Sequence, residues 1–351
     1  MLSLEEEIDL FYSQNKLNQK SAELVELLNG ESFDLETLAC EARRLTRQNF
    51  GNAIKVFTPL YISNYCENGC VYCAFHRDNK ILRRQLEERE IHEQCHRIAA
   101  TGLRQILVLT GEAPKFCDFE YLKNSLKTVA RYFSALSIEV YPMTSEQYKI
   151  LADEIGIDGV TMYQETYDRK LYEKYHLYGK KKDYSWRLNG LVRACKAGIR
   201  SVQLGALLGL SEPIKELSAM AAHVDWLQKN FPETEVGVSF PRIRPIENGG
   251  QIDYFEISDK FYARIIAAFR IVFPNISITL STRENPKMRN GLLNFGISKI
   301  SAGVSTAVGE EDSSGSQFEI ADERSVEEIC DHLQNNGFQA VLHDWNFALV
   351  K

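Results

Sequence analysis

The chain has 351 residues, of which 44% are hydrophobic and 25% are charged, and its formal net charge is −7. This composition is typical of a globular protein with enough chain for a large core, either one barrel or two domains. The acidic, amphipathic start MLSLEEEIDLFYSQNK lacks the basic and apolar stretches of a signal or transit peptide. No window approaches the roughly 20 apolar residues of a membrane helix. We therefore expect a cytoplasmic protein with no membrane partner.

Basic residues are too sparse for a nucleic-acid partner. The one run of three, Lys180–Lys182, is far shorter than the footprint of a protein that binds the phosphate backbone. We interpret this run as a solvated charged segment, with a closing loop over the site as the alternative. The composition favours small-molecule chemistry.

From residue 56 onward, short apolar runs rich in β-formers alternate with longer segments of helical period, which is the pattern of a parallel α/β fold. The helical segments include 88–100, 119–133, 184–197, 216–230 and 259–273. Eight βα units close naturally into a (β/α)8 barrel. The eight apolar runs are 56–63, 105–112, 137–143, 159–166, 201–209, 235–245, 277–284 and 297–305.

The barrel is expected to span residues 51–305. Residues 1–50 read as a helical extension that caps the closed end or an edge of the barrel. Residues 306–351 read as a C-terminal cap with a polar loop at 309–317 and a final helix from Ser325 to Asn335, in which Ser325 and Glu328 form a capping box.

Polar side chains gather at the C-terminal ends of the apolar runs. Glu112, Glu165, Arg242 and Arg283 each lie at such an end. In a parallel barrel these ends open onto one face, where active sites are found, whereas ordinary turn residues would explain only one or two of them. The sequence therefore predicts a single site at that face.

Three of the eight cysteines lie within eight positions, as Cys66, Cys70 and Cys73, directly after the first strand. In a reducing compartment such clustering indicates metal rather than disulfides. Three thiolates can ligate three irons of a cubane and leave the fourth iron open, whereas a passive electron-transfer cluster normally takes four cysteines. A zinc site would need a fourth ligand, for which His76 is the local candidate, but no second C-x2-C knuckle is present.

The C-x3-C-x2-C spacing with Tyr72 before the last cysteine resembles the signature of the radical S-adenosylmethionine (SAM) enzymes. The resemblance implies a [4Fe-4S] cluster whose open iron binds SAM and whose electron splits SAM to a 5′-deoxyadenosyl radical. It also implies SAM contacts, which we expect from Tyr72, Glu112, Glu165, Arg187, Gly205 and Gly209. A solvated arginine is the common alternative for Arg187, because it lies in a helical pattern.

Strings such as PLYISNYCENGCVYC, IEVYPM, YQETY, LSTRE and SQFEIADERSVEE are similar to the 2-iminoacetate synthase family of thiazole biosynthesis. That resemblance implies cleavage of the Cα–Cβ bond of L-tyrosine to dehydroglycine (2-iminoacetate) and p-cresol. It also implies a flavodoxin or ferredoxin type of electron donor and a thiazole synthase partner, within thiamine biosynthesis.

An amino-acid substrate needs a fixed cation for its carboxylate, and Arg283 suits a bidentate clamp. By resemblance, Ser301 and Tyr61 complete the carboxylate and amine pocket, although Tyr61 could instead be a core aromatic residue. Arg242 and Arg244 alternate along one predicted strand, so only one of them is expected to point inward.

Three alternatives remain open. A tryptophan lyase keeps the same barrel and anchors, and no residue excludes an indole. The tyrosine lyase of [FeFe]-hydrogenase maturation adds a C-terminal cysteine cluster, whereas this chain has only Cys330 near its end. A non-catalytic Fe–S electron-transfer protein could use the same three cysteines but would not need Glu112, Glu165 and Arg283 on one face.

Overall fold

The computed structural model describes residues 2–14, 16–30, 33–244, 246, 253–309 and 316–343. Most of the polar loop expected at 309–317 lies outside these ranges, as does the end of the segment 306–351. In the described part of the chain, no helix has the length and apolar character needed to cross a membrane.

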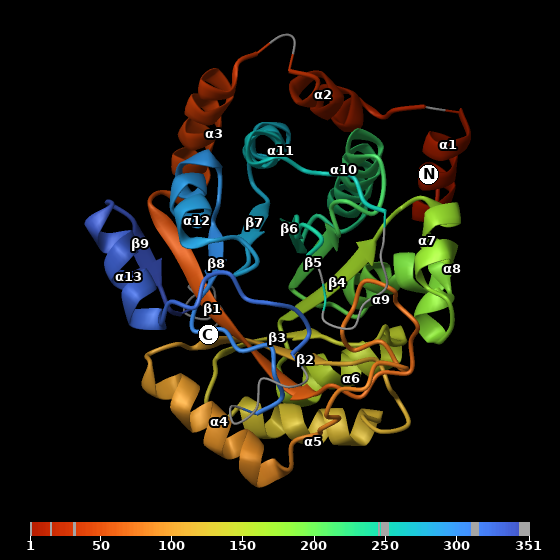
Figure 1. The fold of residues 1–351 in the computed structure, drawn as a ribbon, viewed down its shortest axis with the longest axis vertical. Coiled ribbons are helices and arrows are strands. Elements are labelled where there is room, and N and C mark those ends of the chain that lie inside the picture. Colours follow the sequence, from red (N-terminus) through yellow and green to blue (C-terminus); the bar gives the residue numbers. More distant parts are fainter. Residues whose placement is uncertain are drawn as a thin grey trace.

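Eight parallel strands close into a barrel, which confirms the predicted fold (Figure 1). The strands follow in sequence order around the barrel, and β1 closes it by pairing with both β8 and β2. Their apolar side chains fill the interior and the layer beneath the surrounding helices. The strands are β1 (Ala53–Ser63), β2 (Gln105–Thr110), β3 (Ala135–Glu139), β4 (Gly159–Glu165), β5 (Ser201–Ala206), β6 (Glu235–Ser239), β7 (Ser277–Leu280) and β8 (Lys299–Ser301).

Helices connect the strands on the outside of the barrel (Figure 1). The predicted helices at 88–100 and 259–273 agree with the observed bounds to within one residue, whereas the segment 184–197 forms two helices that meet at Asn189. The helices are α4 (Glu88–Ala100), α5 (Phe119–Val129), α6 (Ser145–Ile155), α7 (Arg169–Tyr175), η1 (Lys180–Lys182), α8 (Tyr184–Leu188), α9 (Gly190–Lys196), α10 (Pro213–Asn230), α11 (Asp259–Val272), α12 (Pro286–Leu292) and η2 (Leu293–Phe295).

Several predicted strands are too long at their C-terminal ends. The run 235–245 is regular strand only to Ser239, followed by an isolated bridge between Arg242 and Leu208, and the run 277–284 is strand only to Leu280. The residues beyond these ends leave the ladder and form the loops of the open face. The first loop residues after these strands also include β-formers, which is why the predicted strands extend too far.

The N-terminal segment forms α1 (Leu4–Gln14), α2 (Gln19–Leu28) and α3 (Leu35–Phe50). These helices lie outside α10 and α11, so they form an additional layer on one side of the barrel (Figure 1). Two contacts show how the layer is fixed. Ser21 Oγ donates to the carbonyl of Ser218 at 2.8 Å, and Arg264 Nη1 donates to the carbonyl of Leu27 at 2.9 Å.

The C-terminal segment returns to the first strand. Helix α13 (Val326–Asn335) begins with the predicted capping box of Ser325 and Glu328, and β9 (Gln339–Val341) pairs in parallel with the start of β1. Asp322 anchors this segment because it accepts hydrogen bonds from Arg289 and Arg324, and Arg289 also donates to the carbonyl of Ser301 on β8. Arg289 and Asp322 are buried.

Replacement of Asp322 by alanine should destabilise the protein by about 3–5 kcal/mol, because it leaves the Arg289 guanidinium buried without its carboxylate. Burial would raise the pKa of Asp322, but Arg324 and Arg289 outweigh burial and lower it to about 2. The stabilising contribution should therefore be present above the unfolded value of about 3.9 and be lost as the pH falls toward 2. Thermal denaturation checks this prediction. Asp331→Ala, at an exposed position of α13, is the control, and an equal loss in both variants would contradict it.

Candidate active site

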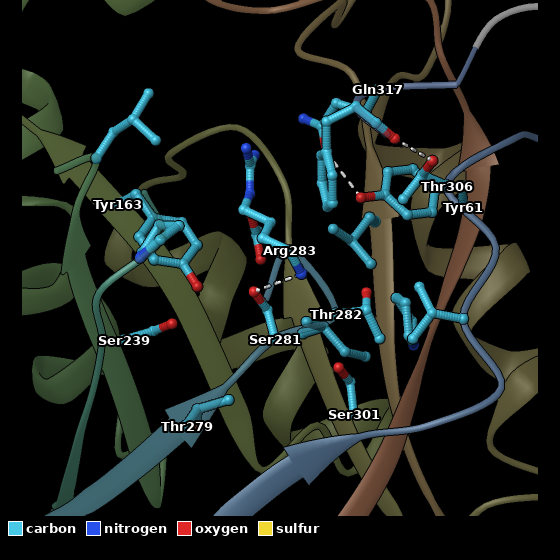
Figure 2. A pocket seen from close by; sticks show the side chains of 18 of the residues that line it. Tyr61, Tyr163, Ser239, Thr279, Ser281, Thr282, Arg283, Ser301, Thr306 and Gln317 are labelled. Atoms are coloured by element: carbon cyan, nitrogen blue, oxygen red, sulfur yellow. Dashed lines mark hydrogen bonds between the residues drawn. The ribbon is translucent and has the colours of Figure 1, made fainter. Parts of the chain in front are cut away.

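A pocket opens at the C-terminal end of the barrel, as the polar strand ends predict. All eight strands contribute side chains to it. Figure 2 shows part of this lining. The loops above the strands add Tyr72, Cys73, Lys181, Arg283, Thr306, Gln317 and Phe318. The strand residues are Phe57, Pro59 and Tyr61 of β1, Leu107 and Leu109 of β2, Glu139 of β3, Tyr163 and Glu165 of β4, Gln203 of β5, Ser239 of β6, Thr279 of β7 and Ser301 of β8.

The cysteine loop after β1 is held in one conformation by backbone hydrogen bonds. Gly69 exchanges hydrogen bonds with Leu177 and Tyr178, and Cys70 forms an isolated bridge with His176. From the other side, Arg83 donates to the carbonyls of Asn64, Phe75 and His76 at 2.6 to 3.0 Å. The loop is therefore preorganised by the chain itself.

The three thiols of this loop lie close enough to affect one another. Burial, with a smaller contribution from the charge of Cys73, raises the pKa of Cys66 to about 11. Burial also raises the pKa of Cys70, to which Cys73 and Cys66 add. Three thiols that resist ionisation together in a buried loop fit a cationic metal cluster, which stabilises thiolates.

A mononuclear metal site is not supported. In the described ranges, no three His, Cys, Asp or Glu side chains are arranged around the position of a single ion. The zinc alternative with His76 needs such convergence, whereas a cubane takes each cysteine on a different iron. The donor set therefore fits the cubane.

Glu112 and Arg187 meet beside the cysteine loop. Arg187 Nη1 donates to Glu112 Oε1, and Asn68 of the cysteine loop donates to Glu112 Oε2 at 3.1 Å. Arg187 also donates from Nε to the carbonyl of Tyr163 at 2.8 Å. Burial alone would lower the pKa of Arg187, but Glu112 raises it overall. The alternative of a solvated Arg187 is therefore wrong, because α8 directs this side chain inward, where it is 5% exposed.

Glu165 and Lys181 form a second ion pair on the same face. Their Oε1 and Nζ atoms are 2.7 Å apart, and both side chains are nearly buried. The interpretation of Lys180–Lys182 as a solvated run is thus wrong for Lys181. A turn of 3-10 helix places its ammonium over the strand ends, whereas Lys180 and Lys182 are exposed. Glu165 has φ +70° at a bulge of β4, a conformation that L residues rarely adopt.

Tyr72 is half-buried and packs against His176, a histidine that no sequence pattern singled out. Its hydroxyl lies 2.6 Å from His176 Nε2, and His176 Nδ1 lies 2.8 Å from the carbonyl of Tyr172. Burial lowers the pKa of His176, so the ring stays neutral. The ring therefore holds Tyr72, and with it the last turn of the cysteine loop.

The two glycines assigned to SAM lie away from the lining of the central pocket. Gly205 lies against the ring of Tyr163, which a Cβ atom would overlap. Gly209 has φ +115° and bonds through its carbonyl to the amide of Phe255 at 2.9 Å. Glu212, at the end of the same motif, caps α10 by accepting from the amides of Ile214 and Lys215.

Arg283, Ser301 and Tyr61 line the same pocket, as predicted for substrate anchors (Figure 2). Arg283 has no carboxylate partner among the described residues, and its guanidinium lies 3.7 Å from the ring centre of Phe318. The Ser301 hydroxyl is buried without a hydrogen-bond partner in the described part of the chain. A free guanidinium and a free hydroxyl in one pocket are the donors that a carboxylate needs.

Arg242 and Arg244 do not follow the predicted alternation. Strand β6 ends at Ser239, so both arginines lie in a loop, and both contact the carboxylate of Glu284. They line a separate pocket and not the central one. The expectation that one of them points into the site is therefore wrong.

Several pocket residues gave no sequence signal beyond their place in a strand or loop. Gln317 accepts a hydrogen bond from the Tyr61 hydroxyl at 2.7 Å, and its Nε2 lies 3.9 Å from Cys73 Sγ. Figure 2 shows Arg283 between Tyr163 on one side and Tyr61 with Gln317 on the other. Glu139, whose inward direction follows from strand alternation, could have been found from the run SIEVYPM.

The closed parallel barrel and its three-cysteine loop define a radical SAM enzyme. A model of the Radical SAM superfamily matches residues 60–224, and a model of the Biotin and Thiamin Synthesis associated domain matches residues 239–339. Enzymes of this superfamily use a [4Fe-4S] cluster and SAM, and these are the cofactors of this chain.

Comparison with individual proteins identifies the family within this superfamily. The chain is 38% identical over 343 residues to 2-iminoacetate synthase of Salmonella typhimurium, covering 96% of this chain and 90% of the relative. It is 39% identical over 320 residues to the Escherichia coli enzyme of the same name, covering 90% and 84%. The chain belongs to the 2-iminoacetate synthase family. The FeFe-hydrogenase maturase HydG from Carboxydothermus hydrogenoformans has the same fold, with a TM-score of 0.87 at 31% identity over 99% of this chain and 87% of that chain.

Replacement of Cys70 by alanine should abolish the [4Fe-4S] cluster and with it all SAM cleavage, because a cubane cannot be held by two thiolates of this loop. Iron and sulfide content, absorbance and 5′-deoxyadenosine formation after anaerobic reconstitution measure this. Cys40→Ala, at an exposed position, and Cys330→Ala are the matched controls and should keep both cluster and cleavage. A full cluster in Cys70→Ala would contradict the assignment.

Proposed function

We propose that this protein cleaves the Cα–Cβ bond of L-tyrosine to 2-iminoacetate and p-cresol. The observation that carries the proposal is the Arg283 guanidinium, which lies in the central pocket without a carboxylate partner among the described residues, beside the free hydroxyl of Ser301. The pocket shares one face with the cysteine loop, so an amino acid bound there would lie next to the cofactors. The family relationship supplies the reaction.

Different residues of this face would hold the cluster and SAM. Cys66, Cys70 and Cys73 would bind the cluster. Glu112 would receive the ammonium group of SAM, and Glu165 and Arg187 would receive its other polar groups. When bound, the cluster and SAM supply a one-electron cleavage that removes a hydrogen atom from the substrate. Gly111 favours this arrangement, because a Cβ atom there would overlap the carbonyl of Tyr65 at the edge of the cysteine loop.

The substrate would be oriented by charge at one end and by apolar walls at the other. Arg283 would hold the carboxylate with two parallel hydrogen bonds, and Ser301 would donate a third. Burial lowers the pKa of Arg283, which nevertheless stays charged. The apolar side chains Phe57, Leu107 and Leu109 line the barrel interior, where the aromatic ring would lie.

Water must be excluded during such chemistry, because a carbon radical abstracts hydrogen from any nearby donor. The segment after β8 contributes to this cover. Gln317 bonds to Tyr61, Thr306 Oγ1 donates to the carbonyl of Phe318 at 3.0 Å, and Phe318 lies over Arg283. Through these contacts, the segment after β8 covers part of the mouth of the pocket.

The reaction products distinguish the tyrosine lyase from the alternative functions. A non-catalytic Fe–S protein would give no 5′-deoxyadenosine from SAM, and a tryptophan lyase would fragment tryptophan instead of tyrosine. Anaerobically reconstituted protein should convert tyrosine to p-cresol and to glyoxylate, the hydrolysis product of 2-iminoacetate, and should leave tryptophan intact. Conversion of tryptophan alone would overturn the proposal. A flavodoxin or ferredoxin donor and a thiazole synthase partner fit this reaction as further parts of the proposal.

Arg283→Ala should lose tyrosine affinity by roughly two to three orders of magnitude while it keeps the cluster, because removal of one partner of a desolvated ion pair costs about 3–5 kcal/mol. Arg283→Lys should recover only part of this loss, since an ammonium cannot make the planar bidentate contact. The measurements are p-cresol, glyoxylate and 5′-deoxyadenosine for each variant. Arg43→Ala, at an exposed position of α3, is the control for loss of an arginine. Wild-type p-cresol formation by Arg283→Ala would place the carboxylate elsewhere.

A further inference from the structure

Glu139 is a carboxylate inside the central pocket that the proposed mechanism has not used. It is the last residue of β3 and lines the pocket together with Tyr61 and Arg283. The carboxylates of Glu112, Glu165 and Glu284 on the same face each have a cationic partner. The side chain of Glu139 makes no hydrogen bond or ion pair within the part of the chain that the structure describes.

Glu139 lies between the residues proposed to hold SAM and those proposed to hold the substrate. The titratable and charged groups that line the pocket with Glu139 are Tyr61 from β1, Tyr72 and Cys73 from the cysteine loop, Tyr163 and Glu165 from β4, Lys181 from η1 and Arg283 after β7. Arg187 from α8 also acts on the charge of Glu139. Burial, together with the charge of Glu165, raises the pKa of Glu139 to about 7, against the opposing effect of the three cations. Of these cations, Lys181 and Arg187 are already paired with Glu165 and Glu112.

A cavity with one unpaired cation and one unpaired anion is complementary to a zwitterion. Arg283 supplies the cation and Glu139 the anion, and an α-amino acid carries its opposite charges on one carbon atom. Tyr61, which the family resemblance assigns to the amine pocket, feels the charge of Glu139 most strongly among its charged neighbours. The site therefore has a place for an ammonium group as well as for a carboxylate.

We propose that Glu139 binds the α-ammonium group of the substrate and accepts one of its protons. This inference rests on the proposed tyrosine cleavage. In the step, one N–H bond of the ammonium breaks and its proton forms an O–H bond on Glu139, so that ammonium and carboxylate become amine and carboxylic acid without oxidation or reduction. The neutral amine keeps a lone pair on nitrogen, which is the atom from which the family reaction removes hydrogen.

Two ligands distinguish an amine contact from any other role of Glu139. L-Tyrosine and 3-(4-hydroxyphenyl)propanoate share the phenol and the carboxylate, but only tyrosine has the amine. Their affinities are measured by anaerobic calorimetry on cluster-loaded, SAM-bound protein, for the wild type, Glu139→Gln and the exposed control Glu173→Gln. Cluster absorbance and SAM affinity confirm that each variant is intact.

Glu139→Gln should weaken tyrosine binding about 10- to 100-fold, as expected for a lost hydrogen bond between charged groups, and should leave binding of the propanoate within a factor of about three. Glu173→Gln should change neither. For the wild type we expect kcat/KM to fall below about pH 7 as Glu139 becomes protonated, and this fall should be absent from Glu139→Gln. Glu139→Asp should restore part of the affinity.

Equal weakening of both ligands by Glu139→Gln would overturn the proposal and assign Glu139 to the phenol or the carboxylate. Unchanged tyrosine affinity would overturn it as well, as would persistence of the acid limb. Failure of the proposed function has a different signature, because wild-type protein would then bind neither ligand. If Glu139→Gln does not retain its cluster, the comparison is made with Glu139→Asp, which should lose tyrosine affinity but not propanoate affinity.

Discussion

Charges withdrawn from water need a partner, and this requirement organises the open face of the barrel. Glu112 pairs with Arg187, Glu165 with Lys181, and Glu284 with Arg242. Each pair joins residues far apart in sequence, so the pairs also fix the loops that carry them. Against this background Arg283 and Glu139 differ, because their side chains have no ionic partner in the described ranges. In our proposal, the bound amino acid supplies the ionic partners of these two side chains.

The paired and unpaired charges divide the face into two regions. The pairs of Glu112 and Glu165 adjoin the cysteine loop, where Asn68 links the loop both to Glu112 and to the amide of Lys181. The unpaired groups lie over the barrel interior. Gln317 lies between the regions, since it contacts Tyr61 on the substrate side and Cys73 on the cluster side. The proposed substrate and cofactor sites are thus joined through a segment that returns from the C-terminal part of the chain.

The sequence was sufficient for the barrel and for the metal loop, because both depend on local patterns: period-two and helical apolar runs, a capping box, and three closely spaced cysteines. Local patterns were insufficient where a side chain is directed by tertiary contacts. In sequence, Lys181 cannot be distinguished from its solvated neighbours, but in the structure it pairs with Glu165. Arg242 was expected in a strand, but it lies beyond the end of β6 and pairs with Glu284. Gln317 gave no signal, because it lies in a loop. Strand alternation gives the inward direction of Glu139, but only the tertiary structure shows which groups share the pocket with it.

The central claim is that the free guanidinium of Arg283 receives the carboxylate of an amino acid on the face that carries the cluster. The most direct test is an anaerobic crystal structure of the cluster-loaded protein with SAM and L-tyrosine. The account predicts that the tyrosine carboxylate lies against the Arg283 guanidinium within hydrogen-bond distance, with the Ser301 hydroxyl as an additional donor and the ring inside the barrel. Tyrosine bound elsewhere, with Arg283 free of its carboxylate, would contradict the account.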